Sequence, residues 1–128
     1  MKLLFDETLA RFPEISGDVR DLDGQATYLV MGELVDWLDS QGRRGFDATV
    51  IQRVVDFAKW CELQPRGDNA SDDIFTVLAV GLYENLFLHE YTRSLIPHLM
   101  CKADLEANKE YLEQWVGCDN YSKALGQF

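Results

Sequence analysis

The chain has few of the features that mark membrane proteins or proteins stabilised by disulfide bonds. No stretch approaches the roughly 20 consecutive apolar residues that a membrane span needs, so we expect no membrane contact. The three cysteines, Cys61, Cys101 and Cys118, cannot all pair within one chain, and none lies in a CxxC motif. No signal peptide is apparent, because Met1-Lys-Leu-Leu-Phe5 is followed at once by two acids. These features predict a cytoplasmic protein with reduced thiols, and we expect Cys61 and Cys101 to be small buried hydrophobes.

Recognisable catalytic and cofactor-binding motifs are also missing. The sequence contains no Walker loop, no GxGxxG, no HExxH and no GxSxG. Its two histidines are His89 and His98, and His98 with Cys101 would supply only half of a four-ligand zinc site. Nothing in the sequence suggests the oxyanion hole that a Cys–His hydrolase needs. We therefore predict no metal, no cofactor and no enzymatic activity.

Basic residues are scarce relative to acidic ones. The chain has 12 Lys and Arg against 22 Asp and Glu, which gives a net charge of −10. That charge repels a phosphate backbone, and Arg43-Arg44 is too small a basic cluster to reverse it, so direct nucleic-acid binding is disfavoured. An acidic surface can instead attract a basic protein and speed its capture. The simpler reading is that the acidity only maintains solubility, and composition does not decide between the two.

The segment 72–88 is the most informative part of the chain. The chain as a whole is 47% hydrophobic and 12% aromatic, which argues against disorder. Within 72–88, the apolar residues that follow Asp72 and Asp73 occupy nearly every helical face, interrupted by Thr76, Gly81, Glu84 and Asn85. A helix that is apolar all round must be surrounded by other helices. We expect 72–88 to be the buried central helix of a small helical domain.

Helical periodicity recurs along most of the remaining chain, and no convincing strand pattern appears. Pro13 should end a short first helix, residues 14–24 read as a loop that could include one helical turn, Gly42 as a C-cap and Asp47 as an N-cap. The further helices expected are 26–40, 48–63, 90–100 with either a kink at Pro97 or a helix restart near Ser94, and 103–116 capped by Gly117. The fold class predicted is all-α, a compact irregular stack of about five to six helices with HEAT-like hairpins. We expect one helical domain over 1–116 and a loosely held C-terminal tail, 117–128, which Tyr121 or Phe128 could pin.

Clustered carboxylates are the candidate partner-binding residues. Glu33, Asp36 and Asp39 are spaced by three and so follow one ridge of the second long helix. Asp72, Asp73 and Glu84 form the second candidate set on the central helix. Asp72 and Asp73 also have a structural explanation, because Ser71 can cap this helix and acids favour its first turn. A solvated acidic face is the commonest reason for such runs, and a binding ridge remains the alternative.

Three segments carry a family resemblance: Arg11-Phe-Pro-Glu-Ile15, Tyr28-Leu-Val-Met-Gly-Glu-Leu-Val-Asp-Trp-Leu38 and Val77-Leu-Ala-Val-Gly-Leu-Tyr-Glu-Asn-Leu86. In this order, with the helix at 48–63 between the last two, they resemble a widespread family of small, acidic, all-helical bacterial proteins. Members of that family are similar to the immunity proteins of polymorphic toxin systems. The resemblance runs from about residue 4 to residue 116. It implies a cytoplasmic protein that binds a cognate toxin stoichiometrically and blocks it without catalysis.

The acidity fits that implication, because many antibacterial toxins are basic around their active sites. Two other classes of function stay open. One is an acidic helical interaction or adaptor protein, cellular or phage-encoded, that could mimic nucleic acid. The other is an enzyme that uses a carboxylate pair in a helical cleft, for which a desolvated carboxyl would be the sign.

Overall fold

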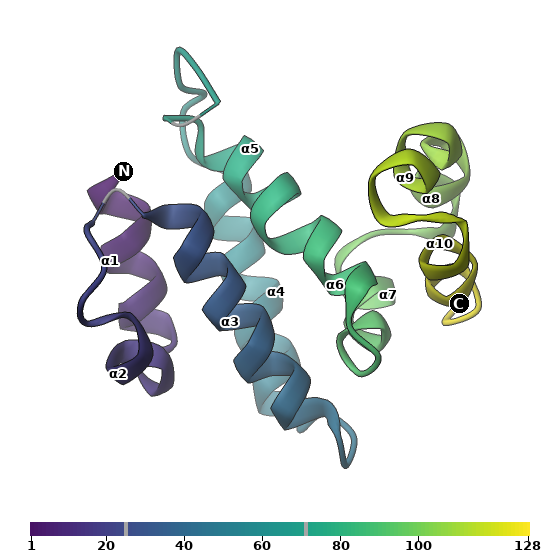
Figure 1. Ribbon diagram of the computed structural model, residues 1–128, viewed down its shortest axis with the longest axis horizontal. Helices are drawn as coiled ribbons and strands as arrows, with labels where there is room; N and C mark the ends of the chain where they lie inside the picture. The colour runs from purple at the N-terminus through teal and green to yellow at the C-terminus, as the bar shows by residue number, and fades with distance from the viewer. Residues whose placement is uncertain (25, 71) are drawn as a thin grey trace.

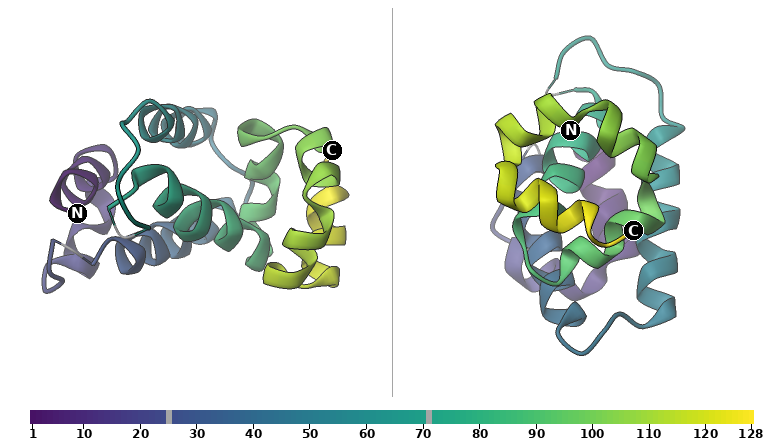
Figure 2. Two further views of the ribbon diagram at one scale, coloured as in Figure 1. Left: turned by 90° about the horizontal axis from the view of Figure 1, so that it is seen from above. Right: turned by 90° about the vertical axis from the view of Figure 1, so that its right-hand side faces the viewer.

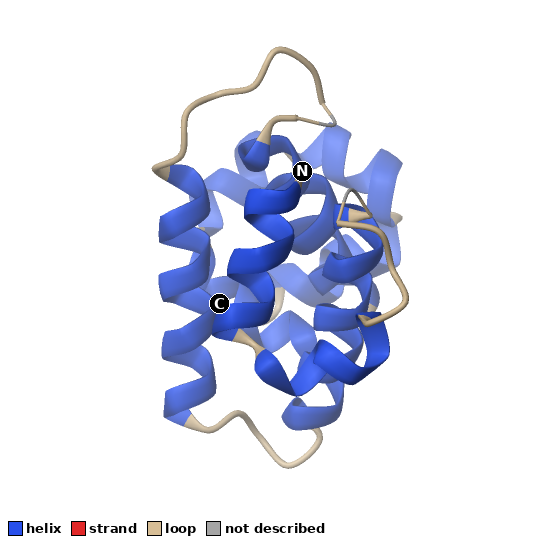
Figure 3. Ribbon diagram, turned by 90° about the vertical axis from the view of Figure 1, so that its left-hand side faces the viewer, coloured by secondary structure: helices blue, strands red, loops and turns tan. Residues whose placement is uncertain are grey.

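The computed structural model describes residues 1–24, 26–70 and 72–128, and these form helices and loops without a strand (Figure 3). The all-α prediction is confirmed. The α-helices are α1 (Lys2–Arg11), α2 (Ser16–Val19), α3 (Thr27–Gly42), α4 (Ala48–Glu62), α5 (Ile74–Val77), α6 (Glu84–Leu88), α7 (Ile96–Leu99), α8 (Lys102–Ala107), α9 (Lys109–Val116) and α10 (Cys118–Leu125). Three further helical segments are η1 (Pro13–Ile15), η2 (Leu78–Tyr83) and η3 (Thr92–Leu95).

The described part of the chain thus has more and shorter helices than the five to six predicted. The segment 14–24, predicted as a loop that could include one helical turn, contains the end of η1 and the four-residue helix α2. The segment 90–100, predicted as a helix that kinks at Pro97 or restarts near Ser94, is a 3₁₀ turn over 92–95 followed by α7. Pro97 lies at the start of α7, where its missing N–H costs no hydrogen bond. The helix predicted over 103–116 is interrupted at Asn108, which separates α8 from α9.

The helices follow one another along an elongated molecule with its termini at opposite ends (Figures 1 and 2). α1 and α2 form one end, while α3, α4 and the segment α5–η2–α6 cross the middle. α8, α9 and α10 form the other end. The buried core runs through all three parts, from Leu4 and Phe12 to Leu105 and Tyr121. No helix in the described ranges is long and apolar enough to cross a membrane.

The central helix begins at Ile74 rather than at residue 72. Asp73 is its N-cap, with a side chain that accepts from the Thr76 N–H, while the cap predicted at Ser71 lies outside the described residues. The helix continues through η2, a π-helical segment in which the Glu84 N–H donates to the Ala79 carbonyl five residues back. Residues 74–88 are therefore a single rod with one wide turn in it (Figure 1).

Burial of the central helix is confirmed for one side and corrected for the other. Its core side chains include Val77, Leu82 and Leu86, each at most 1% exposed. Phe75, Val80 and Leu88, in contrast, stand among the exposed large hydrophobic residues. The apolar residues around the whole helix therefore serve two purposes, a core on one side and an apolar surface on the other.

Local capping signals are confirmed at two positions and corrected at a third. The Asp47 carboxylate accepts from the Thr49 N–H at 2.8 Å and starts α4, and Gly117 ends α9 with a φ of 90°. Gly42, expected as a left-handed C-cap, is instead the last residue of α3 and has no positive φ. Glycine fits this position because there is no space for a side chain: a Cβ there would lie 2.9 Å from the Tyr91 Cβ.

Residues 118–125, predicted as part of a loosely held tail, form the helix α10 and are tied into the structure. The Tyr121 hydroxyl donates to the Leu105 carbonyl at 3.1 Å, so the anchoring role suggested for Tyr121 is confirmed. The buried Arg93 donates to the Phe87 carbonyl at 2.8 Å and to the Asn120 side chain at 2.6 Å. Arg93 thus joins the end of the central helix to α10.

The three cysteines are free thiols. Cys61 is buried, as predicted, whereas Cys101 is exposed, because it is the N-cap of α8 and not an interior residue. Trp115 on α9 is also exposed.

Candidate functional site

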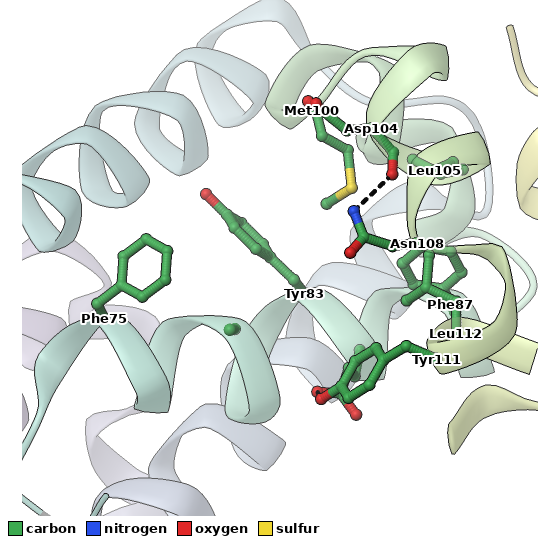
Figure 4. Close-up of a pocket in the computed structure, with 11 residues that line it drawn as sticks. Phe75, Tyr83, Phe87, Met100, Asp104, Leu105, Asn108, Tyr111 and Leu112 are labelled. Carbon is green, nitrogen blue, oxygen red and sulfur yellow. Dashed lines mark hydrogen bonds between the residues drawn. The ribbon is translucent and has the colours of Figure 1, made fainter. Parts of the chain in front are cut away.

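An apolar groove lies between the central helix and the α8–α9 pair, with a volume of about 290 Å³ (Figure 4). The central helix supplies one wall through four residues spaced by four: Phe75, Ala79, Tyr83 and Phe87. The facing wall includes Met100, Leu105, Tyr111 and Leu112. The groove is near the lower end of the volumes of ligand sites, so its size suits one large side chain or a small molecule rather than a bulky cofactor.

Two tyrosine–glutamate hydrogen bonds involve residues that line the groove. The Tyr83 hydroxyl donates to Glu62 Oε1 at 2.9 Å, and the Tyr111 hydroxyl donates to Glu84 Oε2 at 3.1 Å. Burial raises the pKa of Glu84, although the bond from Tyr111 acts in the opposite direction. Burial, followed by the bond to Glu84, also raises the pKa of Tyr111. Glu84 is therefore a partly desolvated carboxylate at the edge of an apolar surface.

The other carboxylate on the groove serves a structural purpose. Asp104 Oδ2 accepts from the Cys101 N–H at 3.4 Å and completes the capping box of α8. The Asn108 side chain donates to the Asp104 main-chain carbonyl at 2.8 Å (Figure 4). Of the two acids that line the groove, Glu84 is thus the one whose carboxylate is not committed to a helix end.

Exposed aromatic rings lie on the lining of the groove and next to it. Phe75 is 39% exposed and Tyr111 48%, both on its lining. Trp115, one turn beyond Tyr111 on α9, is 61% exposed, and the two ring centres are 6.0 Å apart. Tyrosine and tryptophan are enriched in the residues that dominate binding energy at protein interfaces. A groove with such a rim has the composition of a contact surface.

The predicted acidic ridge on α3 divides into two parts. Asp36 is exposed and Glu33 is partly exposed. Asp39 accepts from the Tyr91 N–H at 3.0 Å, which ties α3 to the turn before η3. Glu33 and Asp36 are therefore available to a partner, while Asp39 has a structural hydrogen bond.

The two predicted acids at the start of the central helix, Asp72 and Asp73, also differ in exposure and in their hydrogen bonds. Asp73 is 3% exposed, accepts from Arg66 at 2.8 Å and caps α5. The Arg66 bond is the first cause that holds its pKa below the ordinary value of 3.8. Asp72 is exposed and bonds to the Asn69 side chain within the loop. Asp73 thus stabilises the fold, and Asp72 belongs to the exposed loop that precedes the helix.

Tyr28 lies close to two of the predicted acids. Burial, followed by the charges of Asp73 and Glu84, raises its pKa, so its hydroxyl is within electrostatic reach of both carboxylates. Its ring lies beside Gly81, since a Cβ on Gly81 would be 3.5 Å from Tyr28 Cδ1. Of the six predicted site residues, only Glu84 lines the groove.

No protein-family model, curated protein or solved structure matches this chain. The family resemblance therefore continues to depend on the three sequence segments that carry it. Within residues 1–24, 26–70 and 72–128, no group of three or more His, Cys, Asp or Glu side chains is arranged to hold a metal ion.

Sequence reasoning missed the groove itself. The spacing of Phe75, Ala79, Tyr83 and Phe87 by four residues is a readable signal, but the apolar residues on the other faces of 72–88 favour burial on every side. Tyr111 and Trp115 were the second signal, because two aromatic residues four apart lie on one helical face. Neither pattern shows which other helix lies opposite.

Proposed function

We propose that this protein is an immunity-type inhibitor, which binds a basic protein toxin stoichiometrically and neutralises it by contact. The observation that carries the proposal is the apolar groove with exposed aromatic rings on a chain of net charge −10. An apolar, aromatic centre with charged surroundings is the usual composition of a tight protein interface.

Charge and aromatic contact have separate roles in this proposal. The partly exposed Glu33 and the exposed Asp36 contribute to the field that draws a basic partner in, which raises the association rate. The aromatic groove slows dissociation, because its apolar area is removed from water in the complex. The family resemblance adds the identity of the partner class, a cognate toxin.

The test is coexpression with the product of the neighbouring gene, followed by copurification and by rescue from its toxicity. We expect a one-to-one complex and restored growth. Absence of both a complex and toxicity would remove the toxin proposal. A complex with a protein that is not toxic would instead favour the acidic interaction or adaptor protein.

Variants then separate the two roles. Glu33→Lys with Asp36→Lys should lower the association rate and weaken its dependence on salt, with little change in dissociation. Asp39 is left intact because its hydrogen bond to Tyr91 supports the fold. Trp115→Ala should raise the dissociation rate, with Leu3→Ala on α1 as the matched control for loss of an exposed apolar side chain. Unchanged kinetics in both the charge and Trp115 variants would show that the partner binds elsewhere.

A carboxylate-dependent enzyme is the second candidate, favoured by the raised pKa of Glu84 beside an apolar groove. A paired-carboxylate mechanism needs a second acid directed at the same point. The other acid of the groove, Asp104, accepts instead from the Cys101 N–H. This candidate therefore has less support than binding.

A further inference from the structure

The groove combines an apolar interior with one partly buried carboxylate. Phe75, Tyr83, Phe87 and Met100 supply apolar surface, and Glu84 lies at the edge. Figure 4 shows the aromatic rings arranged around the open space between the central helix and the α8–α9 pair. A purely apolar ligand would leave the Glu84 carboxylate partly desolvated and without a cation. A purely ionic ligand would make no apolar contact with the interior of the groove.

Among residues 1–24, 26–70 and 72–128, the carboxylate of Glu84 has a hydroxyl partner and forms no ion pair with a cation. It accepts from Tyr111 at 3.1 Å. Among the residues that the structure describes, the ion pairs involve other carboxylates, such as Glu14 with Arg53 and Asp73 with Arg66. A partly desolvated carboxylate gains more from a cation than a solvated one, because the surroundings screen the pair less.

We propose that the groove binds an apolar side chain of the basic partner together with an adjacent arginine or lysine, whose cation pairs with Glu84. The identity of the partner as a toxin rests on the proposed function. The chemistry of the occupant rests on the groove alone: an apolar body of about one side chain in size, with a positive charge at its edge.

Benzamidine is a suitable probe, because it joins a phenyl ring to an amidinium with the planar shape of an arginine head group. Benzamide is its neutral counterpart of nearly the same shape. Titration of each into the protein, followed by amide NMR shifts, should move residues of η2 and α9. We expect benzamidine to bind about tenfold more tightly than benzamide, because the charge-assisted bond to Glu84 adds to the same apolar contact.

Glu84→Gln keeps the shape of the side chain and removes its charge. It should lower the affinity for benzamidine about tenfold and leave that for benzamide unchanged. Glu110→Gln, an exposed acid on α9, is the control for general attraction by the acidic surface and should change neither. Tyr111→Phe frees the Glu84 carboxylate from its hydroxyl partner and should maintain or increase benzamidine affinity.

Equal binding of the two probes, equal effects of the Glu84 and Glu110 variants, or shifts confined to other helices would each overturn the proposal. The result is independent of the toxin experiment. Selective benzamidine binding without a toxin complex would leave the groove chemistry standing and remove the immunity function. A toxin complex that Glu84→Gln does not weaken, with no probe binding, would retain the immunity function and remove this occupant.

Discussion

Replacing Gly81 by alanine tests the closest approach between α3 and the central helix. A Cβ at Gly81 would lie 2.9 Å from the Met31 Cγ and 3.1 Å from the Met31 Cβ, and Met31 is fully buried. These two atoms are close to the Met31 main chain, so they can move away only if the helices separate. Such overpacking costs about 1 to 3 kcal/mol, whereas alanine is favoured over glycine inside a helix by about 1 kcal/mol. We expect a net loss of stability of about 0 to 2 kcal/mol.

Gly32→Ala is the matched control, because Gly32 lies inside α3 and a Cβ there would meet no atom within 4 Å. Gly32→Ala should raise the free energy of unfolding by about 1 kcal/mol, from the helix preference of alanine alone, and raise the Tm by about 3 to 5 °C. Urea unfolding followed by far-ultraviolet circular dichroism measures both variants. The difference between them isolates the cost of overpacking, about 1 to 3 kcal/mol. An equal gain in both would refute the contact between Gly81 and Met31.

Three further predictions follow from individual contacts. Tyr121→Phe removes the hydrogen bond to the Leu105 carbonyl. It should lower the free energy of unfolding by about 1 kcal/mol and speed amide hydrogen exchange in α10. Unchanged exchange would show that other contacts hold α10. The pKa of Asp73 is lowered below 3.8 in the folded state, so its contribution to the free energy of unfolding is present above that pH and is lost as the pH falls below it. Urea unfolding between about pH 5 and pH 3 should therefore show a weaker pH dependence of stability for Asp73→Asn than for the wild type. Parallel curves would contradict the lowered pKa of Asp73. Burial raises the pKa of the Cys61 thiol to about 12, so a thiol reagent at mild alkaline pH should modify Cys61 only on unfolding. The exposed Cys101 and Cys118 should react in the folded protein, Cys118 more slowly because its hydrogen bond to Glu113 raises its pKa. Three equally fast thiols would contradict the burial of Cys61.

Features encoded within a few residues were predictable from the sequence. The Asp47 cap depends on Thr49 two residues away, and the positive φ of Gly117 follows from the end of one helix. The burial of Val77, Leu82 and Leu86 followed from the density of apolar residues alone. The all-α class required nothing more than such local signals.

Features that depend on distant partners were not predictable. α10 has only a short apolar side, and it is fixed by Arg93, which is 27 residues from Asn120 in sequence. Asp39 appeared equivalent to Glu33 and Asp36 until the fold brought the Tyr91 N–H against it. The groove likewise requires that α8 and α9 lie opposite the central helix, which periodicity within one helix does not specify.

The π-helical segment η2 determines whether the side chains that form the groove wall point in the same direction. In a uniform α-helix, side chains spaced by four drift about 40° around the axis at each step, so Phe75 and Phe87 would diverge by about 120°. The wider turn, Leu78–Tyr83, includes the whole middle step from Ala79 to Tyr83 and rotates that step back against the drift. All four side chains consequently stay near one line, and the groove has a continuous wall. The length of one turn, rather than the chemistry of any side chain in it, determines how many residues of this helix a ligand can meet at once.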